Sequence, residues 1–223
     1  MSSPAAEQRP TTTGIVITTP RRYDLRILLH TRGREGQFRA EQVRLAGLLG
    51  GEAVLDIGCG TGGFALAAAK AVGPEGSVIG IDPSPEMIGR ARGKARRSRS
   101  RATFETAIVE ALPFADETFD VVTMSLVMHQ LPSDAFHGGM AEVRRVLKPD
   151  GRLFVMDMGG PQDEGRRTAH APHGHAGGHA GFDLEQVTPH FDRFGFEVVA
   201  SGPVEFRLIY LERLRWALAR RSA

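Results

Sequence analysis

The chain has 223 residues, of which 41% are hydrophobic and 24% charged, and its formal net charge is +2. This balance is that of an ordinary globular protein, and the length suits one α/β domain with short appendages. No apolar run could span a bilayer, and the N-terminus lacks the apolar core of a secretory signal. The single cysteine, Cys59, excludes an internal disulfide. We therefore expect a cytoplasmic protein without a membrane partner.

The segment before the first strand is predicted to contain a tail and two helices. Residues 1–20 are rich in Ser, Thr, Pro and Ala, and we expect them to form a disordered tail. Residues 21–30 and 37–49 have helical patterns. We therefore expect an N-terminal helical lid over residues 21–49, within a single domain that spans residues 21–223.

From residue 53 onward, apolar β-rich runs alternate with helical patterns, which is typical of a largely parallel sheet covered on both faces. Strands are expected at residues 53–57, 77–81, 102–108, 119–125, 152–157 and 196–200, with a seventh within 214–219. Helices are expected at residues 64–71, 133–147 and 183–194, and another after the cap Ser84. The turn tripeptide 149–151 is expected to separate its neighbouring helix and strand.

A long loop is predicted over residues 159–181, which are rich in Gly and His and show no periodicity. Imidazoles this close could bind zinc or another borderline metal, or the loop could close over a substrate and provide a base. Because no cysteine accompanies the histidines and the glycines make the loop floppy, we predict no metal site. The histidines concerned are His170, His173, His175 and His179.

Seven basic residues and no acidic residue lie between Arg90 and Arg101. Clustered positive charge attracts phosphate, so an RNA acceptor is an open alternative. No aromatic residues interleave the run to stack on bases. We therefore favour the solvated end of a helix, where cations suit the dipole, and we expect no nucleic-acid partner.

A glycine-rich turn over residues 58–63 follows the first predicted strand. Gly58 and Gly60 let the backbone bend sharply and approach a ligand without an intervening Cβ. The next helix points its free amides at the same place. Asp82 ends the second strand, where a carboxylate can accept both hydroxyls of an adenosine ribose. The sequence therefore predicts a nucleoside site.

The same glycines, together with Gly63, also fit the dinucleotide pattern Gly-x-Gly-x-x-Gly, so an NAD(P)-dependent oxidoreductase is an alternative. Asp56 argues against it, because a carboxylate two residues before the first glycine would repel a pyrophosphate and suit an ammonium group. S-adenosylmethionine carries an ammonium and a sulfonium group and no phosphate. It is the cofactor that these residues favour.

Five motifs occur in order along the chain, at residues 54–62, 78–82, 110–114, 119–122 and 147–153. Together they resemble the class I S-adenosylmethionine-dependent methyltransferases, especially the branch of quinone-biosynthesis C-methyltransferases. The resemblance implies a Rossmann-like three-layer α/β sandwich. Its seven-stranded, mostly parallel sheet would have the order 3-2-1-4-5-7-6, with the last strand antiparallel.

The resemblance also implies a set of cofactor-binding residues. The glycine turn and its acid would surround the methionine part, Asp82 would hold the ribose, and Tyr23 would cover the cofactor, unless Tyr23 is only an ordinary aromatic residue of an amphipathic helix. Others would line the adenine or the rim beside it. The full set is Tyr23, Asp56, Gly58, Gly60, Asp82, Pro83, Met87, Ile108, Val109 and Ser125.

One residue of this set departs from the family pattern. Many relatives have Asp where this chain has Ile108, and that Asp accepts a hydrogen bond from the adenine amino group. Isoleucine cannot accept this bond, so we expect Glu110 or a backbone carbonyl to replace it, or the affinity for the cofactor to be lower.

The reaction site of such a fold lies beyond the carboxyl ends of the strands. There, His129 is the candidate general base, because the pKa of imidazole can lie near neutrality, although a structural histidine is an alternative. Asp157 either contacts substrate or caps the following loop. We expect a small-molecule acceptor that is partly apolar. A non-catalytic binding module is the remaining alternative, and the sequence does not indicate the oligomeric state.

Overall fold

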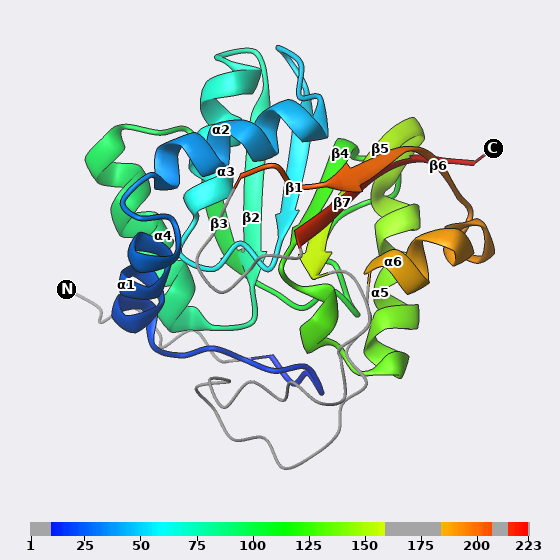
Figure 1. The fold of residues 1–223 in the computed structure, drawn as a ribbon, viewed down its shortest axis with the longest axis horizontal. Coiled ribbons are helices and arrows are strands. Elements are labelled where there is room, and N and C mark those ends of the chain that lie inside the picture. The colour runs from blue at the N-terminus through cyan, green and yellow to red at the C-terminus, as the bar shows by residue number, and fades with distance from the viewer. Residues whose placement is uncertain (1–9, 159–183, 207–213, 223) are drawn as a thin grey trace.

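We describe a computed structural model of the chain, which covers residues 10–158, 184–206 and 214–222 (Figure 1). Seven strands form one sheet in the order β3-β2-β1-β4-β5-β7-β6. β7 is antiparallel to both of its neighbours, and all other pairs are parallel. The predicted fold class, strand order and strand directions are therefore confirmed.

The strands lie close to the expected positions. Their bounds are β1 Ala53–Ile57, β2 Ser77–Asp82, β3 Thr103–Thr106, β4 Phe119–Ser125, β5 Leu147–Met158, β6 Phe196–Pro203 and β7 Leu214–Arg221. β5 begins earlier than expected, because the predicted turn at residues 149–151 is an irregularity inside the strand. Its pairing with β4 shifts between Phe119 and Val121, and Asp150 there has a φ of 63°.

The helices also follow the sequence pattern. Their bounds are α1 Pro20–His30, α2 Glu35–Ala46, α3 Gly63–Val72, α4 Pro85–Ser98, α5 Ser133–Val146 and α6 Leu184–Val187, with short 3-10 helices η1 Met128–Gln130 and η2 Thr188–Phe194. The helix expected over residues 183–194 is split into α6 and η2. Pro189 lies at the junction and has no amide hydrogen to continue an α-helix.

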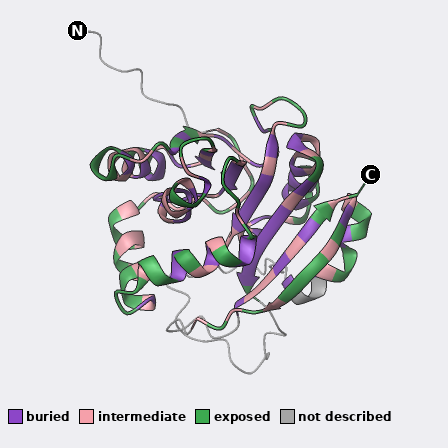
Figure 2. Cartoon of the chain, turned by 90° about the horizontal axis from the view of Figure 1, so that it is seen from above, coloured by how far each residue is buried: buried purple, intermediate pink, exposed green. Residues whose placement is uncertain are grey.

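The sheet forms the middle of three layers. On one face, Phe136 of α5 and Phe191 of η2 pack over the central strands. On the other face, α3 and α4 contribute Phe64 and Ile88, and α2 contributes Phe38 to a further cluster. Figure 2 shows the middle strands as mostly buried and the outward sides of the helices as exposed. None of the described helices has the length and hydropathy needed to cross a bilayer.

The start of α4 agrees with its predicted capping residues. The backbone amide of Met87 donates to Ser84 Oγ at 3.2 Å, and Pro85 occupies the first turn. Ser84 Oγ also donates to Glu86 Oε2 at 2.7 Å. This cap fixes where α4 begins, directly beside the end of β2.

We expect Ser84→Ala to lower the free energy of unfolding by about 1 kcal/mol, because a buried amide at the start of α4 loses its acceptor. Urea denaturation measures this change. Ser98→Ala, at the exposed end of the same helix, is the matched control and should change stability much less. Equal effects of the two substitutions would contradict the capping role.

Candidate active site

A pocket lies at the edge of the sheet where the parallel strands end. Its walls come from the glycine turn after β1, from the ends of β2 and β4, from α1 and from the segment before α1. His129 lies on this wall, and so does every predicted cofactor-binding residue except Asp56. These wall residues are Tyr23, Gly58, Gly60, Asp82, Pro83, Met87, Ile108, Val109 and Ser125.

The glycine turn needs its glycines for two reasons. Gly58 and Gly60 have φ values of 66° and 55°, in the left-handed region that favours glycine. A Cβ on Gly58 would also lie 2.3 Å from a methyl carbon of Val127, and one on Gly60 would lie 3.5 Å from the Tyr23 ring. Space therefore excludes a Cβ at Gly58, whereas at Gly60 it is the positive φ that favours glycine.

Asp82 joins this turn to the start of α4. Its Oδ2 accepts from the Gly60 amide at 3.0 Å, and its Oδ1 accepts from the Ser84 amide at 2.9 Å. Burial raises the pKa of Asp82 to about 6, against the lowering effect of these two hydrogen bonds. Each carboxylate oxygen can accept a further bond, so Asp82 can also receive hydroxyl groups from the pocket.

Asp56, which is predicted to lie around the methionine part of the cofactor, is buried beneath the pocket and is not among the residues of its wall. It is 2% exposed, and its Oδ1 accepts from Thr123 Oγ1 at 2.9 Å. Its Oδ2 is buried without a hydrogen-bond partner among the described residues. Burial raises the pKa of Asp56 to about 7, although the Thr123 bond and the Arg39 charge lower it in part. A cationic group in the pocket would stabilise its ionised form.

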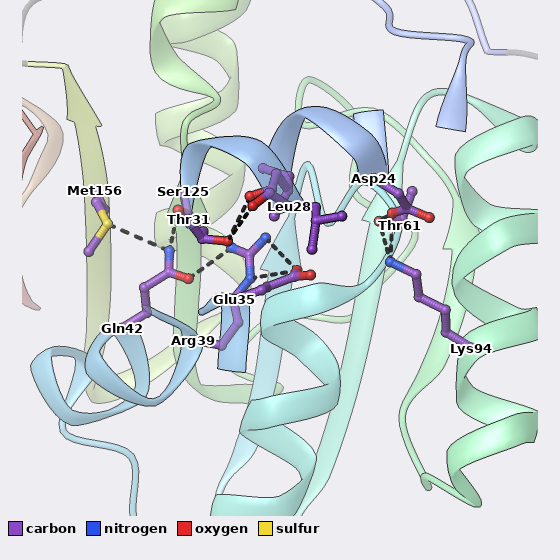
Figure 3. Close-up of polar contacts among 11 residues, drawn as sticks. Asp24, Leu28, Thr31, Glu35, Arg39, Gln42, Thr61, Lys94, Ser125 and Met156 are labelled. Atoms are coloured by element: carbon purple, nitrogen blue, oxygen red, sulfur yellow. Dashed lines mark hydrogen bonds and ion pairs between the residues drawn. The ribbon is translucent and has the colours of Figure 1, made fainter. Parts of the chain in front are cut away.

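A polar chain from α2 supports the pocket from behind (Figure 3). Arg39 donates to Gln42 Oε1 at 2.8 Å and is ion-paired with Glu35 at 3.3 Å. Gln42 Nε2 in turn donates to Ser125 Oγ at 2.6 Å. Because Ser125 accepts this bond, its own hydroxyl proton can point into the pocket. Arg39 and Gln42 were not among the predicted site residues. Both are polar residues on the buried side of α2, and this polarity is the only feature that marks them.

Tyr23 and Asp24 attach α1 to the pocket. Tyr23 packs on the glycine turn. Asp24 accepts hydrogen bonds from Lys94 Nζ and Thr61 Oγ1, both at 2.7 Å (Figure 3). It also accepts one from Arg90 Nε at 2.8 Å. Burial would raise the pKa of Asp24, but these three hydrogen bonds hold it below its usual value. Part of the predicted solvated basic run therefore holds α1 in place.

Residues 12–17, which were expected to belong to a disordered tail, lie against the pocket instead. Thr12 Oγ1 donates to Glu110 Oε1 at 2.7 Å, and the Ile15 amide donates to the Gln130 carbonyl at 3.1 Å. Thr12, Ile15 and Ile17 line the pocket. The apolar run 15–17 was the signal for this packing. Residues 1–9 lie outside the described residues.

His129, on the pocket wall, forms a hydrogen-bonded pair with Asp157. His129 Nδ1 lies 2.7 Å from Asp157 Oδ1, and the His129 amide donates to Asp157 Oδ2 at 3.2 Å. Asp157 is fully buried. A carboxylate at this distance favours the imidazole tautomer with its proton on Nδ1, which leaves Nε2 as the basic nitrogen.

The predicted loop 159–181 and its four histidines lie outside the described residues. Within the residues that are described, no group of three or more His, Cys, Asp or Glu side chains is arranged to hold a metal ion. What the loop does remains a prediction.

Comparison with known proteins agrees with this geometry. Residues 54–151 match a family model described as a methyltransferase domain. Residues 54–151 are therefore similar in sequence to methyltransferase domains. Among curated proteins, the chain is 37% identical over 142 residues to the ubiquinone/menaquinone biosynthesis C-methyltransferase UbiE of Citrifermentans bemidjiense, which covers 63% of the chain and 60% of that protein.

A second curated relative is the demethylmenaquinone methyltransferase of Lactobacillus johnsonii, 33% identical over 62% of the chain and 57% of that protein. The chain thus spans less than two thirds of the length of these relatives. A solved methyltransferase from Aquifex aeolicus has a TM-score of 0.70 and 21% identity, covering 92% of this chain and all of that one. A solved [4+2]-cyclase, SpnF, shares the fold with a TM-score of 0.66 and 21% identity, covering 84% of this chain and 80% of that one.

The buried Asp56 makes the stability of the protein depend on pH. Because its pKa of about 7 in the folded state exceeds the ordinary value, the folded state binds its proton more tightly than the unfolded state. The free energy of unfolding should therefore fall as the pH rises from about 4 to 7. Asp56→Asn should reduce this slope, measured by urea denaturation across the range.

Asp120→Asn is the matched control. Burial would raise the pKa of Asp120, but the hydrogen bond from Lys148 and others lower it overall, so Asp120 contributes a slope of opposite sign. Asp120→Asn should therefore still show the fall in the free energy of unfolding between pH 4 and 7. A slope that is the same in wild type and Asp56→Asn would contradict the raised pKa.

Proposed function

We propose that this methyltransferase moves a methyl group from S-adenosylmethionine to a small, partly apolar acceptor of the quinone type. The observation that carries the proposal is the placement of Asp82 and His129 on the wall of one pocket above the glycine turn. Asp82 can accept hydrogen bonds from ribose hydroxyls, and His129 can remove a proton from the acceptor.

The pocket residues fit the cofactor. The turn excludes side chains where a nucleoside would approach, Asp82 can accept ribose hydroxyls, and the unpaired buried oxygen of Asp56 favours a nearby cation. Ser125 can donate its hydroxyl proton to an anionic group. When bound, the cofactor supplies a methyl group made electrophilic by its sulfonium.

Glu110 is the residue that we assign to the adenine amino group. It lies on the pocket wall beside Ile108 and Val109, and Thr12 already donates to one of its oxygens. A carboxylate can accept a further bond, whereas the side chain of Ile108 cannot accept any. Glu110 thus supplies the acceptor that the family pattern places at residue 108.

His129 acts as the general base in this proposal. With Nδ1 hydrogen-bonded to Asp157, Nε2 can take the proton that the acceptor loses as the new bond to the methyl carbon forms. Apolar side chains of Ile15, Leu131 and Met158 line the same pocket and suit a partly apolar acceptor. The names of the two curated relatives, which mention ubiquinone, menaquinone and demethylmenaquinone, support an acceptor of this class.

Transfer of labelled methyl from S-adenosylmethionine to a reduced demethylated quinone with a short side chain tests the proposal. The expected result is a labelled quinone. Comparing the affinity for S-adenosylhomocysteine with the affinity for NAD distinguishes the methyltransferase from the oxidoreductase alternative. Tight binding of NAD without S-adenosylhomocysteine, or binding without any methyl transfer to small molecules, would overturn the proposal.

Asp82→Ala should weaken binding of S-adenosylhomocysteine by roughly 1.5–3 kcal/mol, because hydrogen bonds to a charged acceptor are lost. Isothermal titration calorimetry measures this loss. Asp116→Ala, on an exposed carboxylate paired with Arg145, is the control and should leave affinity unchanged. Unaltered affinity in Asp82→Ala would refute the ribose assignment.

Asp157→Asn should lower kcat/KM by at least about 10²-fold while leaving the affinity for S-adenosylhomocysteine unchanged. An amide that donates to Nδ1 would place the imidazole proton on Nε2 and remove the base. His129→Gln should lower the rate similarly, and both variants should lose the rise of rate with pH that a histidine base gives. His137→Gln, on the exposed side of α5, is the control. Full activity in His129→Gln would exclude the base role.

A further inference from the structure

Three large apolar side chains of α1 point away from the body of the protein. Leu25, Leu28 and Leu29 are 54%, 52% and 60% exposed, and α1 contains no buried residue. They are three of the seven exposed large apolar side chains of the described residues. An exposed apolar group of this size on one short helix indicates an interaction surface.

The opposite side of α1 is fixed against the pocket, so the leucines cannot simply turn inward. Tyr23 and Ile27 line the pocket, and Asp24 is ion-paired with Lys94 and Arg90 on α4. At helical spacing, Leu25 and Leu29 lie on the side of the helix opposite Tyr23 and Ile27. Leu28 lies one turn after Asp24 on the flank between these two sides, where it is 52% exposed. Figure 1 shows α1 at the outside of the molecule, at the edge where the strands end.

The charge around the leucines is strongly positive. Arg21 and Arg22 are exposed at the start of α1, and Arg32 and Arg34 are exposed just after its end. The single acid between residues 20 and 34 is Asp24, whose carboxylate is already ion-paired inward. We define the α1 outer face as the three leucines with these four arginines.

The rim of the pocket continues this character. Ile15 and Met158 line the pocket and are still 39% and 40% exposed. The apolar α1 outer face and the apolar mouth of the pocket therefore belong to the same end of the molecule.

We propose that the α1 outer face docks on an anionic phospholipid surface. The leucines would enter the boundary between headgroups and acyl chains, and the four arginines would contact the anionic headgroups, as in interfacial amphipathic helices. Charge complementarity favours this occupant over a second copy of the chain, whose own α1 arginines would repel it. A helix that lies on a bilayer need not span it, so the lack of a spanning segment does not oppose this docking.

The proposal that the α1 outer face docks on lipid does not depend on the proposed methyl transfer. Only its consequence, that an apolar acceptor reaches the pocket from the lipid side, rests on the proposed function. A binding experiment without cofactor or acceptor therefore fails or succeeds separately from the methyltransferase assay.

Co-sedimentation of the full chain with vesicles tests the proposal. One vesicle contains phosphatidylcholine alone, and the other contains equal parts of phosphatidylcholine and phosphatidylglycerol. The wild type should sediment with the anionic vesicles, less so at high salt, and little with phosphatidylcholine alone. Replacing Arg21 and Arg22 by Ala should lower the partition coefficient roughly fivefold for each arginine.

The triple substitution Leu25→Ser, Leu28→Ser and Leu29→Ser should lower partitioning more than about tenfold. Leu49→Ser is the matched control, because Leu49 is 63% exposed on the loop after α2, away from these arginines. A charge control replaces Arg96, Arg97 and Arg99 by Ala at the far end of α4 and should have a much smaller effect than Arg21→Ala with Arg22→Ala.

Leu28→Trp gives a second readout that does not depend on losing a contact. Its fluorescence should shift to the blue with anionic vesicles, whereas that of Leu49→Trp should not. No sedimentation of the wild type, unchanged sedimentation of the triple leucine variant, equal loss in the α4 charge control, or leucine-dependent self-association without vesicle binding would each overturn the proposal.

Discussion

The two hydrogen bonds that Asp82 accepts from the backbone organise the whole candidate site. One amide belongs to the glycine turn after β1, and the other belongs to the residue that caps α4. A single carboxylate thereby connects the start of α4 to the glycine turn, whose Gly60 lies 22 residues before Asp82. Because it is almost fully buried, its charge is costly, and its pKa rises to about 6.

The same end of the sheet carries three carboxylates in different environments. Asp56 is buried with an unpaired oxygen, Asp82 is held by amides, and Asp157 is paired with His129. The first two have raised pKa values of about 7 and 6, so a cationic ligand would bring charge that the protein lacks there. Perturbed acids that converge on one pocket are typical of binding and catalytic sites. This electrostatic arrangement suits a sulfonium nucleoside better than a pyrophosphate.

Much of this fold could be predicted because its signals are local. The apolar run of β1 and the turn residues after it identify a buried parallel strand and its bend, and Ser84 with Pro85 identifies the start of a helix. The strand order came from the family resemblance, since pairing between distant strands has no local signature.

The parts that could not be predicted depend on long-range contacts. Thr12 reaches Glu110, 98 residues away, so the composition of its segment suggested only a tail. The place of Gln42 behind Ser125 depends on how α2 crosses the sheet, 83 residues from its partner. The depth of Asp56 beneath the glycine turn depends on its packing with Thr123 of β4, 67 residues away, and has no local signal in the sequence. The outward leucines of α1 became visible only once its inward side was fixed.

A crystal structure with S-adenosylhomocysteine bound tests the central claim most directly. The account predicts both ribose hydroxyls within hydrogen-bonding distance of the Asp82 carboxylate, the nucleoside over the Gly58–Gly60 turn, and the sulfur on the side of the pocket that holds His129. A ligand bound elsewhere, or a ribose that does not contact Asp82, would contradict it.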